Sequence, residues 1–204
     1  MSFYARRILP HLVNLAMRHP TFTRLRAPVI AGAAGRVLEI GVGSGLNLAF
    51  YGPDASAVLG IDPSAELLAI ARARAGRSAV PVSLLEGSAE LLPLEAASID
   101  TVVTTWTLCT IPDAARALAE VRRVLRRSGR LLFIEHGRSP DARIARWQDR
   151  LDPLWGRLAG GCHLNRPIDA LIAGNGFAIE VLRHRRLPGP PTHTFLSEGI
   201  ATPR

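Results

Sequence analysis

The stretch VLEIGVGSG, residues 37–45, runs from a short apolar segment directly into three glycines at every second position. Glycine adopts left-handed backbone conformations without strain and lets a ligand come close to the main chain. A glycine-rich turn that follows a strand and precedes a helix is typical of nucleotide-binding α/β domains. One acid, Glu39, stands just ahead of the glycines, where a carboxylate would repel a phosphate.

This turn differs from dinucleotide-binding turns in the spacing of its glycines and in the acid that precedes them. The dinucleotide fingerprint is GxGxxG, and its helix N-terminus binds a pyrophosphate, whereas Gly41, Gly43 and Gly45 follow the pattern GxGxG. A ligand with positive charge and no phosphate resolves the conflict. S-adenosylmethionine has a sulfonium and an ammonium group, so Glu39 is expected to favour it directly or through water.

Two later segments extend the predicted cofactor site. Asp62, in GIDPS, follows the second apolar run about 20 residues after the glycines, where an acid accepts hydrogen bonds from ribose hydroxyls. Nicotinamide and flavin dinucleotides share this acid, so Asp62 alone does not discriminate. The segment 85–93, LEGSAELLP, is expected to pass over the adenine, with contacts from Ser88 or Ala89 backbone N–H groups and the Glu90 side chain.

Apolar runs of strand length alternate with segments of helical spacing along the chain. Strands are predicted at 37–40, 57–61, 82–86, 101–105, 130–135, 177–184 and about 194–201, and helices at 45–51, 64–75, 113–127 and 167–175. Such alternation predicts a Rossmann-like, doubly wound α/β fold with a mostly parallel sheet. The last two strands, joined by LPGPP, are expected to form an antiparallel hairpin at one edge. Asp100 opens the fourth strand and is expected to be structural.

Length and composition indicate a single domain over residues 1–204. The chain is 48% hydrophobic and long enough for one substantial core. Residues 1–34 are predicted to form an N-terminal helical cap, and 138–166 a helix-and-loop insertion over the acceptor site. Two cysteines make no disulfide framework, and no run reaches the roughly 20 apolar residues of a membrane span. These features predict a cytoplasmic protein.

The positively charged residues of the chain are all arginines. All 25 basic residues are Arg, and the net charge is +8. Most lie on predicted helix faces, where a solvated surface is the favoured interpretation, so nucleic acid is not the expected partner. The basic, amphipathic segment 3–19 is expected to cover a cleft or pack on the domain. The alternative is that it rests on the inner face of an anionic membrane.

A series of motifs in order resembles the class I S-adenosylmethionine-dependent methyltransferases across nearly the whole chain. These motifs are LEIGVGSG, GIDPS, EGSAELLP, SIDTVVTTWTLCTIPD, ALAEVRRVLRRSGRLLFIEHG and GNGFAIE. Within that family the chain is most similar to a methyltransferase-like group whose animal members are membrane-associated alkyl thiol methyltransferases. GLNLAFY, TLC, EHG and WQDRLDPLWGRLAGGCHLNR carry this closer resemblance. Quinone C-methyltransferases and phospholipid N-methyltransferases are similar more distantly.

The resemblance implies a seven-stranded sheet with one antiparallel strand near the C-terminus, and a set of cofactor contacts. The predicted contacts are Glu39, Gly41, Gly43, Gly45, Asn47, Asp62, Pro63, Ser88, Ala89, Glu90 and Thr105. The implied reaction is methyl transfer from S-adenosylmethionine, with S-adenosylhomocysteine as product, to a small apolar acceptor, best a thiol. The alternatives are a phospholipid or quinone methyltransferase at the membrane surface, and a non-catalytic cofactor- or RNA-binding module.

Candidate catalytic residues follow the fourth and fifth predicted strands, because reacting groups in open α/β sheets lie beyond the carboxyl ends of strands. Trp106 is one of them. His136 is predicted to be a general base or to position the acceptor; the alternative is a hydrogen bond to the cofactor loop or the insertion. His163 is a second candidate, with a structural role as its alternative.

The remaining cysteines and tryptophans are expected mainly in structural roles. Cys109 and Cys162 are interpreted as small buried hydrophobes, and no metal is predicted because no CxxC or HxxxH spacing exists. Trp106, Trp147 and Trp155 are candidates for lining an apolar acceptor pocket. Trp147 and Trp155 share a helix face only in an unbroken helix, and Pro153 predicts a break.

Overall fold

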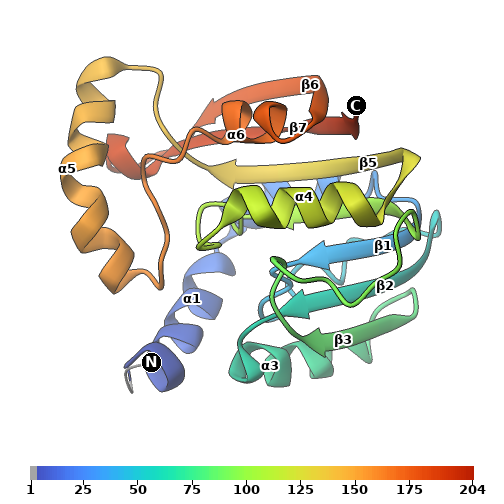
Figure 1. The fold of residues 1–204 in the computed structure, drawn as a ribbon. Helices are drawn as coiled ribbons and strands as arrows, with labels where there is room; N and C mark the ends of the chain where they lie inside the picture. The colour runs from blue at the N-terminus through green and yellow to red at the C-terminus, as the bar shows by residue number, and fades with distance from the viewer. Residues whose placement is uncertain (1–3) are drawn as a thin grey trace.

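A seven-stranded sheet with the strand order β3-β2-β1-β4-β5-β7-β6 runs through the protein (Figure 1). The computed structural model describes residues 4–204. The strands are β1 Gly35–Ile40, β2 Ala55–Asp62, β3 Val82–Glu86, β4 Ile99–Thr105, β5 Leu125–His136, β6 Phe177–Arg186 and β7 Phe195–Pro203. β7 pairs antiparallel with both β5 and β6, while the pairs among β1 to β5 are parallel. The predicted fold and the edge hairpin are confirmed.

Helices cover the sheet and extend past its carboxyl edge. They are η1 Tyr4–Ile8, α1 Leu9–Met17, α2 Pro20–Ile30, α3 Ala65–Ala75, α4 Ala114–Val124, α5 Ala142–Leu158, α6 Ile168–Gly174 and the short η2 Pro191–His193. Residues 1–3 of the predicted N-terminal cap, and the side chain of Arg6, lie outside what is described. Ser64 and Asp113 cap α3 and α4 by accepting hydrogen bonds from Leu67 and Arg116 backbone N–H groups.

The two faces of the sheet carry separate hydrophobic clusters. Phe133, Val102 and Leu38 lie under α4 and α6 in one cluster, while Val103 and Leu132 belong to the other, with residues of α2 and α3. Neighbouring residues of one strand thus point to opposite faces. Because both faces are buried, the central strands carry consecutive apolar residues, such as Val37–Leu38 and Val102–Val103, which makes them recognisable in the sequence.

The predicted helix at 45–51 is wrong: this segment between β1 and β2 is a series of turns. Its backbone hydrogen bonds span three residues, from Leu48 to Gly45 and from Phe50 to Asn47, and do not continue as a helix. Gly52 and Pro53 follow at once and leave no room for a second helical turn.

The predicted break at Pro153 is also wrong, because α5 is a single helix with this proline inside. Trp147 and Trp155 are therefore about 80° apart around the axis at 3.6 residues per turn. Their surroundings nevertheless differ. Trp147 is exposed and lies beside Arg150, whereas Trp155 packs edge-on against His193.

The helices α1 and α5 lie beyond the carboxyl ends of the parallel strands (Figure 1). β1 and β4 are neighbours in the sheet although β2 and β3 lie between them in the chain, so the order of strands reverses at this point. In open α/β sheets, ligands bind beyond the carboxyl ends at such a reversal. The fold therefore places the site between the ends of β1 and β4.

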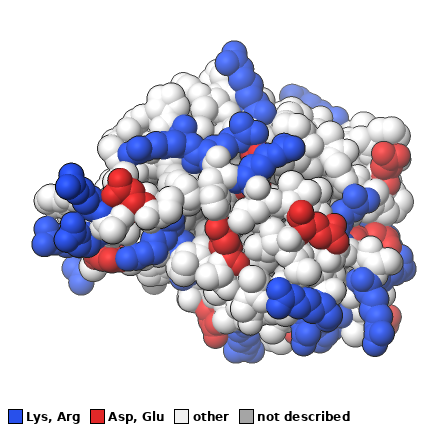
Figure 2. Space-filling view, turned by 90° about the horizontal axis from the view of Figure 1, so that it is seen from above, with Lys and Arg blue, Asp and Glu red and all other residues white. Residues whose placement is uncertain are grey.

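On the face in Figure 2, arginine and acidic side chains are interspersed among other residues. Several arginines are paired with acids, among them Arg138 with Asp149 and Arg123 with Glu120. At the opposite, amino end of the sheet, Asp100 accepts a hydrogen bond from the Arg36 backbone and pairs with Arg126. Its predicted structural role is confirmed.

Among residues 4–204, none of the helices combines the length and the apolar character that crossing a bilayer requires.

Candidate active site

The glycine turn after β1 has three left-handed residues: Gly41, Gly43 and Gly45 have φ values of +68°, +54° and +77°. At Gly41 a side chain would overlap Thr107, since its first carbon would lie 2.2 Å from the Thr107 hydroxyl. At Gly43 the same carbon would meet nothing closer than 3.9 Å. The turn therefore packs tightly against the end of β4 at Gly41 and leaves space beside Gly43.

Glu39 lies underneath this turn in a buried polar network. Its side chain accepts 2.7 Å hydrogen bonds from the Asn47 amide and from the Tyr51 hydroxyl, and the Asn47 amide also reaches the Thr105 hydroxyl at 3.0 Å. Burial raises the pKa of Glu39 to about 7, although these two hydrogen bonds and Arg26 lower it in part. A nearby cation would stabilise the ionised form of this carboxylate.

Asp62, the last residue of β2, links the second strand to the glycine turn. One carboxylate oxygen accepts from the Gly43 backbone N–H and the other from that of Ser64, both at 2.9 Å. Burial raises the pKa of Asp62, and these two backbone hydrogen bonds lower it in part. Glu39, Asp62 and the glycines are thus brought together, as expected from their spacing.

Two observations show that these residues fit S-adenosylmethionine. The Asn47 side-chain oxygen is buried without a hydrogen-bond partner among the residues described, so an acceptor held in place by Glu39 is available to an ammonium group. The space beside Gly43 is open to a ligand. The ligand's positive charge would lie near a buried carboxylate, where a phosphate would be repelled.

The residues predicted to contact the adenine lie in the loop after β3, where Glu90 bonds to residues of the protein itself. The Glu90 carboxylate accepts hydrogen bonds from the Asp113 backbone, at 2.7 Å, and from the Ser88 hydroxyl, at 3.2 Å. It therefore joins the loop after β3 to the start of α4. Ala89 is buried in the core, while Pro63 is exposed.

Trp106, directly after β4, has a left-handed backbone with φ +52°, which is uncommon for a residue with a side chain. Phe22 of α2 meets its ring edge-on at 5.3 Å between centroids, and the Arg26 guanidinium lies 5.4 Å from the ring centre. Strained backbone of this kind is characteristic of functional sites. The N-terminal helix α2 therefore contacts the predicted acceptor side directly.

Glu135 is a residue that the sequence analysis did not include in the site. Its carboxylate accepts hydrogen bonds from the Thr104 hydroxyl at 2.7 Å, from the Thr107 backbone at 2.9 Å and from the Cys109 backbone at 3.4 Å. Burial raises its pKa to about 7, partly offset by these hydrogen bonds. Glu135 therefore holds the turn after β4. The available signal in the sequence was an acid at the end of an apolar run, just before a candidate histidine.

The other end of this turn is fixed by the insertion. The Arg166 guanidinium donates hydrogen bonds to the carbonyls of Leu108 and Ile111. Asn165 instead binds Asp149 of α5. The backbone N–H of His163 donates to the Cys109 carbonyl at 2.8 Å, so the insertion and the turn lie against each other.

His136, the last residue of β5, is buried beside two cysteines. Its Nδ1 lies 4.0 Å from the Cys162 sulfur, and its Nε2 has no hydrogen-bond partner among the described residues. His163 is separate, since its Nδ1 pairs with the Asp152 carboxylate at 2.9 Å and its side chain is 40% exposed. The geometry thus favours His136 over His163 for contact with an acceptor.

Comparison with known proteins bears on the family of this chain. Residues 38–133 match a family described as "Methyltransferase domain". Thiol S-methyltransferase TMT1A of Homo sapiens is 34% identical over 164 residues, which cover 78% of this chain and 67% of that protein. The human thiol S-methyltransferase TMT1B is 34% identical over 143 residues, 67% of this chain and 58% of the relative. This match therefore spans less than two thirds of TMT1B.

A bacterial relative and a solved structure extend the comparison. Phosphatidylethanolamine N-methyltransferase of Cereibacter sphaeroides is 36% identical over 115 residues, 55% of this chain and 56% of that protein. The crystal structure of YcgJ from Bacillus subtilis has a TM-score of 0.68 at 18% identity, and covers 92% of this chain and 99% of that one. The latter likeness shows the fold. The sequence matches show more: the chain belongs to the S-adenosylmethionine-dependent methyltransferase family.

Proposed function

We propose that this protein transfers a methyl group from S-adenosylmethionine to a small apolar thiol. The observation that carries the proposal is the Asn47 side-chain oxygen, free of partners among the described residues and held at the glycine turn by buried Glu39. The thiol S-methyltransferase relatives support a thiol acceptor. The bound cofactor would supply an already activated electrophilic methyl group.

The protein's main task is then to align the acceptor and exclude water, which can account for several kcal/mol of the barrier. Glu39, Asn47 and Asp62 would hold the cofactor at the ends of β1 and β2. Trp106, covered by Phe22 and Arg26 of α2, would form an apolar wall at the end of β4. A thiol needs only modest activation, because its pKa is near 8.5.

His136 is the residue we assign to the acceptor. Its Nε2 has no partner among the side chains that the structure describes, so it can receive the proton of a thiol or hold the sulfur in line. Cofactor binding would not depend on this imidazole. Removal of His136 should therefore lower the rate of methyl transfer while affinity for the cofactor stays within about twofold.

The direct test measures S-adenosylhomocysteine formation with a panel of alkyl thiols, phenols, quinones and phosphatidylethanolamine. We expect turnover with the thiols, and a decrease of roughly 10²–10⁴-fold in His136→Ala if the imidazole is a general base. An unchanged maximal rate of His136→Ala across pH would exclude the base. Cofactor binding without turnover of any acceptor would favour the non-catalytic alternative.

A phospholipid acceptor at a membrane surface is the second candidate, because apolar side chains of α1 and α5 are exposed. Leu12 and Leu15 of α1 are 50% and 67% exposed, and Leu154 of α5 is 60% exposed. Arg7 and Arg18 flank α1, and α5 carries several arginines. Exposed leucines close to basic residues are typical of helices that lie on anionic membranes. Leu12→Ser/Leu15→Ser should reduce co-sedimentation with anionic vesicles and turnover of phosphatidylethanolamine together, but leave turnover of a soluble thiol unchanged.

A further inference from the structure

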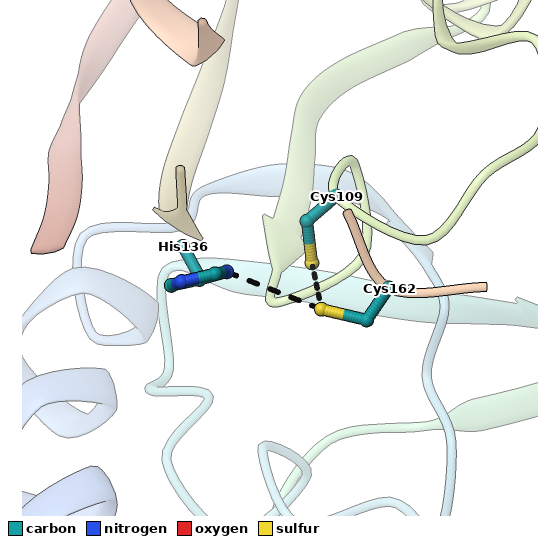
Figure 3. Close-up of side chains that lie close together, drawn as sticks. All are labelled: Cys109, His136 and Cys162. Atoms are coloured by element: carbon teal, nitrogen blue, oxygen red, sulfur yellow. Dashed lines mark hydrogen bonds between the residues drawn. The ribbon is translucent and has the colours of Figure 1, made fainter. Parts of the chain in front are cut away.

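Three side chains with metal-binding chemistry meet at the carboxyl ends of β4 and β5: Cys109, His136 and Cys162 (Figure 3). One ligand atom from each lies within 4.8 Å of the other two. The segments are 27 and 26 residues apart in the chain, so no short sequence spacing revealed the group. We propose that these three residues form a zinc-binding site of the Cys2His type with a fourth, open position.

The separations within the group match those in a tetrahedral zinc site. A Zn–S distance of about 2.3 Å at the tetrahedral angle separates two thiolate ligands by about 3.8 Å, and a thiolate from an imidazole nitrogen by about 3.6 Å. The Cys109 and Cys162 sulfurs are 3.7 Å apart, and the Cys162 sulfur is 4.0 Å from His136 Nδ1. A disulfide would need the two sulfurs at about 2.05 Å and would leave the imidazole without a role.

Backbone contacts hold the three ligands where a zinc ion would need them. The Cys109 carbonyl accepts from the His163 backbone N–H at 2.8 Å, which ties together the two segments that carry the cysteines. The Glu135 carboxylate fixes the turn that carries Cys109 by accepting hydrogen bonds from the backbone N–H groups of Thr107 and Cys109. His136 is held in the sheet opposite Leu196 of β7. The ligands are thus preorganised by elements that do not depend on the metal.

The turn at Gly160 and Gly161 brings Cys162 to the group. Both glycines are left-handed, with φ +65° and +91°, and a side-chain carbon at Gly161 would lie 3.4 Å from the Thr110 carbonyl. Glycine therefore permits the close approach of this loop to the turn after β4.

A buried donor lies beside Cys162. The Trp155 indole N–H has no hydrogen-bond partner in the described part of the chain, and it lies close to the Cys162 sulfur. An N–H beside a metal-bound sulfur is a stabilising outer-shell contact.

The accessible side of the group is that of Cys162. Cys109 and His136 are buried, whereas Cys162 is partly exposed, so a small molecule can approach from this side. A Cys2His site leaves one tetrahedral position to water or substrate. If the protein methylates thiols as proposed above, an acceptor thiol would take this position as a thiolate, with its proton released to solvent. His136 would then act as a ligand through Nδ1 in place of a proton acceptor, and this assignment of the acceptor rests on the proposed function.

Metal content and cobalt spectroscopy test the site without any assay of methyl transfer. The full-length protein is purified with reductant, stripped with a chelator and titrated with Co²⁺, then with Zn²⁺ in competition. We expect one ion per chain, thiolate-to-cobalt charge-transfer absorption and ligand-field bands of four-coordinate strength. Cys109→Ser and Cys162→Ser should each weaken zinc affinity at least by the roughly 10–100-fold that losing even an outer-shell partner costs.

Variants of the two histidines test which imidazole binds the metal. His136→Cys retains three soft ligands and should keep binding zinc, whereas His136→Ala should lose affinity. His163→Ala is the matched control: it is the neighbour of Cys162, but its imidazole binds Asp152. Circular dichroism confirms that each variant is folded.

The proposal is overturned if the reduced protein binds no stoichiometric zinc or cobalt, if His163→Ala weakens binding as much as Cys162→Ser, or if mass spectrometry finds a Cys109–Cys162 disulfide that survives purification with reductant. If no metal binds but thiols are still methylated, the zinc site is wrong and the proposed function holds. If zinc binds but no thiol is methylated, the zinc site holds and the proposed function is wrong.

Discussion

Glu39 and Glu135 occupy the same position in two different strands and act in different ways. Each is the penultimate residue of its strand, β1 or β5, and each is buried with a pKa raised to about 7 by desolvation. Glu39 is bound by two side chains of the segment that follows it, Asn47 and Tyr51. Glu135 is bound mainly by backbone N–H groups of the turn after β4.

This difference in partners separates a ligand-binding carboxylate from a structural one. Side-chain amides and hydroxyls can turn and exchange donor and acceptor roles, so the network around Glu39 can adjust to a bound cation. Backbone N–H groups can only donate, so the turn after β4 requires hydrogen-bond acceptors at position 135. The ligand site is thus built from adjustable partners and its support from fixed ones.

The largest expected effect is the loss of stability in Glu135→Gln. The new amide group would face backbone N–H donors with its own donors, so at least one donor of Thr107 or Cys109 would be buried without a partner. We expect the free energy of unfolding at pH 7 to fall by roughly 3–5 kcal/mol. Urea denaturation followed by circular dichroism measures it. Glu86→Gln, an exposed acid at the end of β3, is the control and should be neutral.

The same substitution at Glu39 should act in the opposite direction, and in a pH-dependent way. The pKa of Glu39 is about 7 in the folded chain against an ordinary value of 4.5, so the folded protein binds this proton more tightly than the unfolded chain. Its contribution to stability is therefore lost as pH rises from about 4.5 to about 7. A glutamine has no such loss, and Tyr51 can accept a hydrogen bond from its amide.

Glu39→Gln should accordingly match the native protein near pH 4 and exceed its stability by up to about 3 kcal/mol at pH 8, from 1.36 kcal/mol per pKa unit. Denaturation at several pH values gives the two curves. Parallel curves, or a variant that is less stable at pH 8, would mean that Glu39 is ionised at no cost and that the two carboxylates do not differ as described. The same variant should bind S-adenosylmethionine more weakly.

The half of the molecule around Glu39 could be predicted from sequence, and the half around Glu135 largely could not. The glycine turn, Glu39 and Asn47 lie within nine residues, and Asp62 follows at a distance fixed by one strand-turn-strand unit. The helices predicted to begin at 64 and 113 are confirmed for the same local reason, since Ser64 and Asp113 each cap the helix that follows. The helix predicted at 45–51 and the break predicted at Pro153 were both wrong, because neighbouring residues and tertiary packing determine these segments.

The acceptor side depends on contacts between distant segments. Cys109 and Cys162 are separated by 53 residues and meet because β4 and β5 are neighbours and the insertion returns to the turn between β4 and α4. The role of Glu135 as a support for that turn depends on the same pairing. Sequence spacing carries no information about such contacts until the strand order is known.

The glycine turn allows the ligand-binding side to be tested apart from the fold. Gly43→Ala places a methyl group in the open space beside the turn, at a left-handed residue, and should cost about 1 kcal/mol of stability. We expect its affinity for S-adenosylmethionine to fall at least tenfold, about 1.4 kcal/mol, by isothermal calorimetry. Gly52→Ala, also in open space but without a left-handed φ, is the matched control and should bind normally. Equal affinities in both variants would place the cofactor elsewhere.

Adjacent threonines at the end of β4 give the smallest and finest test, because each serves one of the two carboxylates. The Thr104 hydroxyl donates to Glu135 at 2.7 Å, whereas the Thr105 hydroxyl accepts from the Asn47 amide, which keeps its bond to Glu39. Thr104→Val should therefore cost about 1.5 kcal/mol of stability and leave cofactor affinity unchanged, while Thr105→Val should cost at most about 0.5 kcal/mol. Its effect should be on affinity, since the orientation of Asn47 is then less restricted. If Thr105→Val proved the more destabilising of the pair, the network around Glu39 would be as rigid as the one around Glu135, and adjustable partners could not be what distinguishes the ligand site from its support.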